Sequence, residues 1–208
     1  MRLLHGVGLA PLLLLVLRAT AADPSPASLS EPVGRISFKV DRARVLVPIQ
    51  IGGSRVLDIT LDSGMPFDGV YLFHREIQDE LPDVEFIEVR VPGAGAGEPS
   101  HAVMADSVAF TSGGIEFENQ RIIVSQSPST QSFPTSGVLG YSILGSHVVE
   151  IDYDESVMYL YEPETYQPPA GWERLDLTLQ KNIPFLDAAV SVAGEDDIPV
   201  RVYIDLAS

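Results

Sequence analysis

The stretch "ITLDSGMPF", Ile59 to Phe67, places an aspartate, a small hydroxyl residue and a glycine directly after an apolar, β-branched run. Such a run is typical of a buried strand. A charged carboxylate is rarely buried without a partner, so Asp62 is either a turn cap or a group held in a cleft. The rest of the sequence has to decide between these two interpretations.

Short β-branched and partly alternating segments lie on both sides of this stretch. They are separated by glycine-rich and proline-rich turns at hairpin spacing, and helix candidates are limited to 72–81 and the region of Tyr141. The pattern predicts an all-β domain that closes near Pro163. The segments are "ISFKV", "RVLVPIQI", "RVLDITLD", "GVYLF", "VEFIEVRV", "HAVMADSVAF", "IEFENQRIIVSQ", "HVVEIDY" and "VMYLYEP".

Part of the sequence around Asp62 occurs a second time near the end of the chain. The segment "VPIQIGGSRVLDITLDSG" (47–64) aligns with "AAVSVAGEDDIPVRVYIDLAS" (188–208), with Gly53 opposite Gly194 and Asp62 opposite Asp205. The second copy has two more residues in its turn. The spacing between the aspartates is about that of one small domain, so we expect a second lobe to begin here.

The triplet Asp62-Ser63-Gly64 at a strand end, the later Gly137-Val138-Leu139-Gly140 and the segment "VVEIDYDESVMYLY" together resemble the retropepsin-like aspartic proteases. The likeness is in particular to exported bacterial aspartyl-protease-like proteins that carry two lobes in one chain. The resemblance implies a closed β-barrel lobe over 34–163, a linker over 164–181 and the start of a truncated second lobe of the same kind over 182–208.

The resemblance also implies roles for individual residues. One catalytic carboxylate would come from each lobe, a neighbouring hydroxyl and glycine would support the loop, and a hydrophobic-glycine pair would pack beneath it. A glycine-rich hairpin tip would cover the substrate as a flap. The residues are Asp62 and Asp205 as the catalytic pair, Ser63, Gly64, Leu139 and Gly140 as the support, and Gly93, Gly95 and Gly97 in the flap.

Two carboxylates held about 3 Å apart cannot both ionise, so they share a proton and titrate as a pair. One acts as a base on a water molecule and the other as an acid on a peptide carbonyl. A hydroxyl at Ser63 can hydrogen-bond into the opposite lobe, and Gly64 lets backbone N–H groups approach the carboxylate. The function implied is that of an aspartic-type endopeptidase with a polypeptide substrate and no cofactor.

The second copy departs from the family pattern, because Leu206 and Ala207 replace the hydroxyl residue and the glycine; Met65 also stands where a small residue is common. Either the sequence is part of a longer chain, or Asp62 pairs with itself in a homodimer. We favour the first, since a lobe cut at this point would expose apolar strand edges. A catalytically inactive, peptide-binding relative is the alternative function.

Composition and the N-terminus set further expectations. The net charge of −16 argues against nucleic acid as a partner, and the chain contains no cysteine. Residues 1–21 have the pattern of a secretory signal peptide, followed by a flexible linker over 22–33, so we expect an exported protein without membrane insertion after cleavage. An uncleaved anchor is the alternative. His74, His101 and His147 lack ligand spacing, and no metal site is expected.

Overall fold

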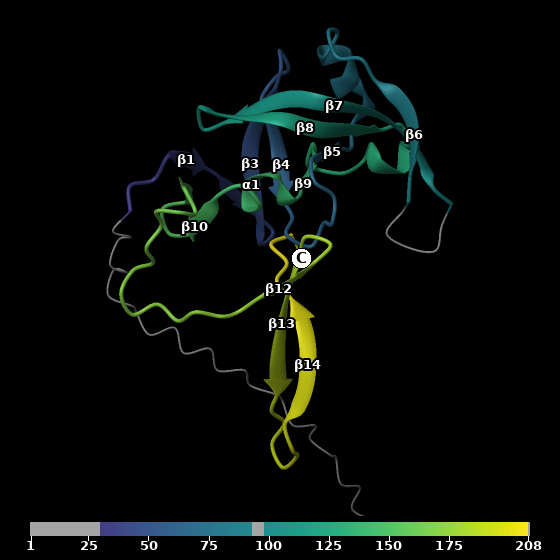
Figure 1. Cartoon of the computed structure of the whole chain (residues 1–208). Coiled ribbons are helices and arrows are strands. Elements are labelled where there is room, and N and C mark those ends of the chain that lie inside the picture. The colour runs from purple at the N-terminus through teal and green to yellow at the C-terminus, as the bar shows by residue number, and fades with distance from the viewer. Residues whose placement is uncertain (1–29, 93–97, 208) are drawn as a thin grey trace, which may run out of the picture.

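The computed structural model describes residues 30–92 and 98–207. It is an all-β structure, with 47% of residues in strands and 8% in helices (Figure 1). The predicted signal peptide, the first residues of the predicted linker and the three flap glycines lie outside the described residues. Within the described part, no helix is long and apolar enough to cross a membrane.

Six strands close into a barrel, which confirms the expected all-β barrel. The sheet has the order β2-β3-β4-β9-β5-β8-β7-β6, and an additional pairing of β3 with β7 closes the ring. Strands β2 and β6 extend it at either end. The strands are β2 (Lys39–Asp41), β3 (Arg44–Ile51), β4 (Leu57–Leu61), β5 (Val70–Leu72), β6 (Ile87–Val91), β7 (Ser100–Ser112), β8 (Ile115–Ser125) and β9 (Gly137–Leu139).

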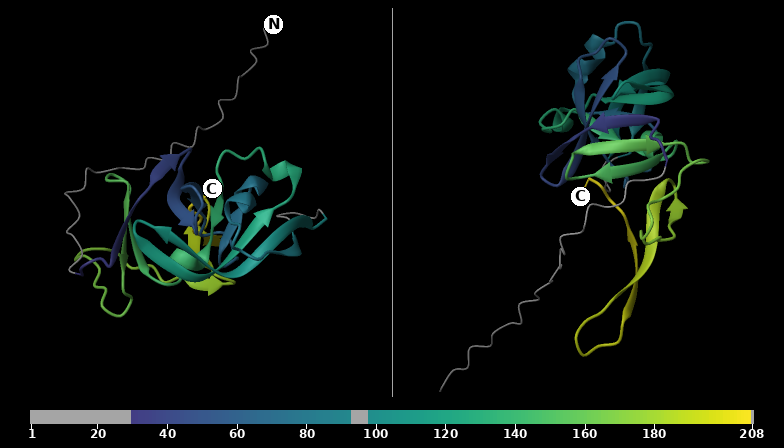
Figure 2. Two further views of the ribbon diagram at one scale, coloured as in Figure 1. Left: turned by 90° about the horizontal axis from the view of Figure 1, so that it is seen from above. Right: turned by 90° about the vertical axis from the view of Figure 1, so that its left-hand side faces the viewer.

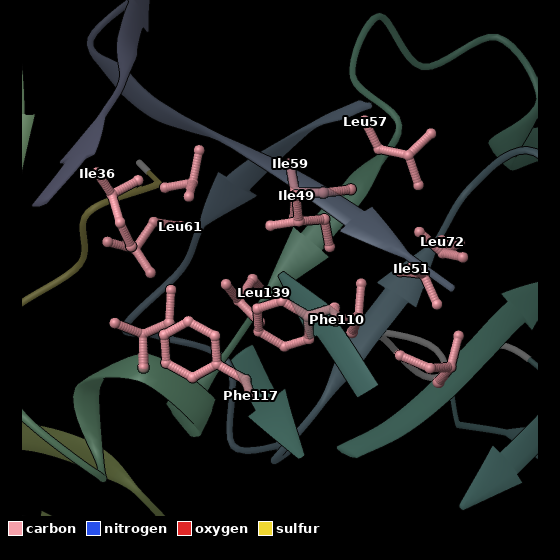
Figure 3. Packing of buried hydrophobic residues seen from close by; sticks show 14 of the residues in the cluster. Ile36, Ile49, Ile51, Leu57, Ile59, Leu61, Leu72, Phe110, Phe117 and Leu139 are labelled. Carbon is pink, nitrogen blue, oxygen red and sulfur yellow. The ribbon is translucent and has the colours of Figure 1, made fainter. Parts of the chain in front are cut away.

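The barrel interior is filled by alternate residues of these strands, as a period of two requires. Ile49 on β3 and Ile59 and Leu61 on β4 are at most 1% exposed, and they pack with Leu139 on β9 (Figure 3). Phe110 on β7 is equally buried. Each such side chain contributes about 1.5–3 kcal/mol relative to exposure, so the alternating runs stabilise the closed barrel.

Strand β9 was expected only as a support beneath the aspartate, and the structure shows that it belongs to the sheet. It lies between β4, to which it is parallel, and β5, to which it is antiparallel. Leu61 is the partner of Leu139, so the end of β4 lies beside the end of β9. The residue that follows β4 is therefore fixed by two neighbouring strands.

A second sheet packs beside the barrel. It consists of β1 (Gly34–Ser37), β11 (Val157–Tyr161) and β10 (Val148–Asp152) in the order β1-β11-β10. The short helix α1 (Tyr141–Leu144) follows β9, while the 3-10 helices η1 (Arg75–Glu80) and η2 (Pro128–Thr130) occur in loops. The two helix candidates expected from the sequence, 72–81 and the region of Tyr141, thus correspond to η1 and α1, which are short.

A third sheet projects away from the barrel, as Figure 1 and the right panel of Figure 2 show. It contains β12 (Thr178–Gln180), β13 (Ile183–Val190) and β14 (Ile198–Tyr203). The chain then turns back, so that the C-terminal residues lie next to the barrel (Figure 1).

The two faces of the β13–β14 hairpin differ in polarity. On one face the opposed pairs are Leu186 with Val202, Ala188 with Val200, and Val190 with Ile198. Val190, Ile198 and Val202 are 48%, 49% and 43% exposed. We call this set of six residues the apolar hairpin face. In the first copy of the repeat, the face with the same alternation is the barrel interior; in the second, it faces solvent.

Candidate functional site

Asp62 follows β4 directly and is held by backbone hydrogen bonds. Its own N–H donates to the carbonyl oxygen of Leu139 at 2.9 Å, and its Oδ1 accepts the N–H of Gly64 at 2.9 Å. The N–H of Met65 donates to the Asp62 carbonyl at 3.4 Å. The apolar strand therefore ends in a tight turn that points the carboxylate in one direction.

Asp205 lies just after β14, separated from it by Ile204, and its loop sequence differs. Its Oδ1 accepts the N–H of Ala207 at 2.8 Å, which repeats the contact between Asp62 and Gly64. The N–H of Ile204 donates to the carbonyl oxygen of Pro184 at 3.0 Å, at the base of the hairpin. Alanine in place of glycine thus leaves this turn intact.

Ser63 joins the two loops. Its hydroxyl donates to the carbonyl oxygen of Ile204 at 2.8 Å and accepts the N–H of Leu206 at 3.0 Å. The Ser63 side chain is buried, with 7% exposure. One hydroxyl thus satisfies two backbone groups more than 140 residues away in the sequence.

The two carboxylates both border the bare backbone of Gly64. A Cβ built on Gly64 would lie 3.2 Å from both Cγ and Oδ2 of Asp205, and 3.3 Å from Oδ1 of Asp62. The Oδ1 atom of Asp62 and the Oδ2 atom of Asp205 are therefore no farther apart than the sum of their distances to that Cβ position. A side chain at position 64 would occupy the space that both carboxylates border.

Burial of Asp62 raises its pKa, and the nearby charge of Asp205 raises that pKa further. The N–H groups of Gly64 and Met65 oppose this by stabilising the carboxylate, but the net direction is upward. Asp62 therefore keeps a proton to higher pH than an ordinary aspartate. A proton-holding carboxyl group beside a second carboxyl group can both donate and accept a proton within one site.

Leu139 and Gly140 lie against the Asp62 loop. Leu139 is fully buried, and its carbonyl binds the Asp62 N–H. A Cβ on Gly140 would come within 2.2 Å of the Phe67 carbonyl oxygen. The absence of a side chain at Gly140 therefore allows the 65–67 loop to pack closely on the end of β9.

Two cavities border this site. The larger has a volume of about 900 Å³ and lies between the 65–67 loop and the outer face of the sheet formed by β5, β6, β7 and β8. Tyr71, Phe73 and Phe133 give it an aromatic lining. The smaller, about 370 Å³, includes Asp62 and Ser63 and extends to α1, β10 and β12.

Sequence reasoning did not find the cavity residues. Met65 was noted only as a departure from the family pattern, and Tyr71, Phe73 and Phe133 were not distinguished from core residues. A local signal existed for Phe133, which lies in a segment rich in serine and proline. The strand residues Tyr71 and Ile123 carried no such signal, because a β-branched or aromatic residue on a strand can face either side.

The structure does not bring the histidines together into a metal site. His74 contacts the carbonyl oxygen of Phe133 at 3.0 Å through Nε2, and His147 contacts the Ser146 hydroxyl at 2.9 Å through Nδ1. Among residues 30–92 and 98–207, no group of three or more histidine, cysteine, aspartate or glutamate side chains could hold a metal ion.

No protein-family model matches the chain, and no curated protein matches it.

Proposed function

We propose that this protein is an aspartic-type endopeptidase of retropepsin-like architecture, in which Asp62 and Asp205 activate a water molecule for peptide hydrolysis. The observation that carries the proposal is the position of both carboxylates beside Gly64, held there by the double hydrogen bond of Ser63. The resemblance of the Asp62-Ser63-Gly64 and Gly137–Gly140 segments to that family supports the same assignment.

The chemistry follows from one shared proton. The carboxylate without the proton takes a proton from the water molecule. At the same time, the oxygen of the water attacks the peptide carbonyl carbon. Asp62, whose pKa is raised, donates its proton to the carbonyl oxygen, which gives a neutral tetrahedral intermediate. Return of a proton to the amide nitrogen then breaks the C–N bond and releases an amine and a carboxylic acid.

The surroundings of the pair suit an extended peptide. The larger cavity includes Met65, three residues after Asp62, and is lined mainly by apolar and aromatic side chains. A peptide whose carbonyl lies at the carboxylates can place an apolar side chain there. The acidic net charge and the signal-like N-terminus fit an exported peptidase rather than a nucleic-acid-binding protein.

The test is peptide cleavage by the purified chain between about pH 3 and pH 7, with cleavage sites located by mass spectrometry. We expect Asp62→Asn and Asp205→Asn each to abolish cleavage and a statine-type transition-state mimic to inhibit it. Asp58→Asn is the matched control, because Asp58 lies on the same strand and pairs with Lys39 at the surface. Cleavage that survives Asp62→Asn would overturn the proposal.

A second candidate is a peptide-binding protein without hydrolytic activity. Leu206 favours it, since this residue stands where the family has a second hydroxyl and lines the smaller cavity instead. This candidate predicts that wild type and Asp62→Asn bind the same peptides with similar affinity and that neither cleaves them.

A further inference from the structure

Met65 occupies a special position between the two cavities. Among the described residues, it is the one that lines both the cavity of about 900 Å³ and the cavity of about 370 Å³. It follows Asp62-Ser63-Gly64 directly, and its N–H donates to the Asp62 carbonyl. Met65 therefore forms a wall between the two cavities, three residues after Asp62 in the sequence.

The side chain of Met65 is held in place by its packing. Its Cε lies 3.3 Å from the position that a Cβ on Gly140 would take, so the thioether extends across the bare backbone of Gly140. The Gly140 N–H donates to the carbonyl oxygen of Gly69 at 3.3 Å, which fixes this backbone to the residue that precedes β5. The wall thus rests on a rigid part of the barrel.

Apolar side chains line both cavities around Met65. On one side lie the aromatic side chains of Phe67, Tyr71 and Phe73, and on the other Leu144 and Leu206. An apolar group that enters the larger cavity meets Met65 at the end closest to the carboxylates. The length of that group is therefore limited by the methionine side chain.

We propose that Met65 is a specificity-determining residue, which separates the larger cavity from the smaller one and so limits how far an apolar peptide side chain can extend toward the carboxylates. Removing its side chain would join the two cavities and admit a larger group, such as tryptophan or naphthylalanine. This inference rests on the proposed function, since it takes a peptide as the ligand of the site. It does not require that the peptide be cleaved.

The test uses peptides that differ only in one apolar residue, placed in turn within two positions of the cleaved bond. The quantity is the ratio of kcat/KM for the naphthylalanine peptide to that for the leucine peptide. We expect Met65→Ala to raise this ratio about tenfold, as a change of this size in an apolar pocket does. Met65→Leu, which keeps the volume, should leave the ratio unchanged.

Met104→Ala is the matched control. Met104 lines the larger cavity from β7 but not the smaller one, so its removal enlarges the cavity without opening the wall. An equal rise in the ratio with Met104→Ala, or no rise with Met65→Ala, would overturn the inference. Thermal unfolding of each variant shows whether the fold is retained. If Met65→Ala unfolds, Met65→Val, which also shortens the side chain, should raise the ratio in the same direction, and no rise would overturn the inference.

A binding measurement separates this inference from the proposed function. The same peptides, labelled with a fluorophore, are titrated with Asp62→Asn and with Asp62→Asn carrying Met65→Ala, and anisotropy gives the ratio of their Kd values. A tenfold shift without any cleavage by wild type would refute hydrolysis and support the role of Met65. Cleavage with neither ratio changed would refute the role of Met65 alone, and absence of all peptide binding would refute both.

Discussion

The hydroxyl of Ser63 accepts the backbone N–H of Leu206 at 3.0 Å, across 143 residues of sequence. The same hydroxyl donates to Ile204, so both cross-loop hydrogen bonds depend on one side chain. Leu206 has no hydroxyl with which to return the contact. The carboxylate pair is thus positioned asymmetrically, with the first loop holding the second.

Replacing Ser63 with alanine should release the second loop. Ser63→Ala leaves the Leu206 N–H and the Ile204 carbonyl without their partner, which we expect to cost about 1–3 kcal/mol and to lower cleavage at least tenfold. Ser63→Thr keeps the hydroxyl and should retain most of the stability and most of the cleavage activity. Hydrogen exchange at the Leu206 amide measures the release directly, and unchanged exchange in Ser63→Ala would contradict the assigned contact.

Stability should fall with rising pH through the titration of Asp62. Because its folded pKa is raised above the unfolded value of 3.8, the folded chain binds more protons than the unfolded chain between these two pKa values. The contribution of Asp62 is therefore fully present below pH 3.8 and is lost as the pH rises through the folded pKa.

Urea unfolding of wild type and Asp62→Asn over this range measures the effect. The stability of wild type relative to the variant should decrease as the pH rises. The cleavage proposed above should decline over the same window, because it needs the proton on Asp62. A relative stability that increases with pH would show that the pKa of Asp62 is lowered instead.

A methyl group at position 64 should separate the carboxylates. In Gly64→Ala the new Cβ would lie 3.2 Å from Asp205 and 3.3 Å from Asp62, closer than most such contacts, so one of the two side chains has to move. We expect a loss of cleavage of at least tenfold with a small change in unfolding temperature, since geometry at the reacting group is sensitive to small displacements.

Gly53→Ala is the control for this prediction. Gly53 lies in the turn between β3 and β4, and a Cβ there meets nothing within 4 Å. Activity and stability should both stay near wild type in this variant. Equal losses in the two alanine variants would mean that the loss at position 64 arises from the backbone rather than from the carboxylates.

The apolar hairpin face should bind hydrophobic probes and promote self-association. Val202→Glu places a charge on this face, where Val202 is 43% exposed, and should reduce both dye fluorescence and the concentration dependence of the sedimentation coefficient. Ala189→Glu is the control, because Ala189 pairs with Pro199 on the opposite face. Identical behaviour of the two variants would show that the face is not the binding surface.

Much of the fold and the pair of aspartates could be predicted from the sequence. The alternation in "RVLVPIQI" and "RVLDITLD" places Ile49 and Ile59 on one face of their strands, and the structure buries both. The repeat placed Asp62 opposite Asp205, and the structure brings their carboxylates to the same space beside Gly64. These features depend on local periodicity and on matching short segments.

Other features depend on which strands become neighbours. The pairing of β3 with β7 closes the barrel, and the pairing of β9 with β4 places Leu139 beneath Asp62. Both join segments that are far apart in the sequence, and many alternative pairings would satisfy the same alternation. Only the tertiary structure decides them, because register and closure are properties of the whole sheet.

The sequence by itself determined that the chain is all-β and that Asp62 and Asp205 occupy equivalent positions in a repeat. Only the tertiary structure decided that Ser63 reaches Leu206 and Ile204, and that Met65 stands between two cavities. The physical reason is that periodicity along a strand sets which residues share a face. The contacts between loops depend instead on how strands that are far apart in the sequence pack together.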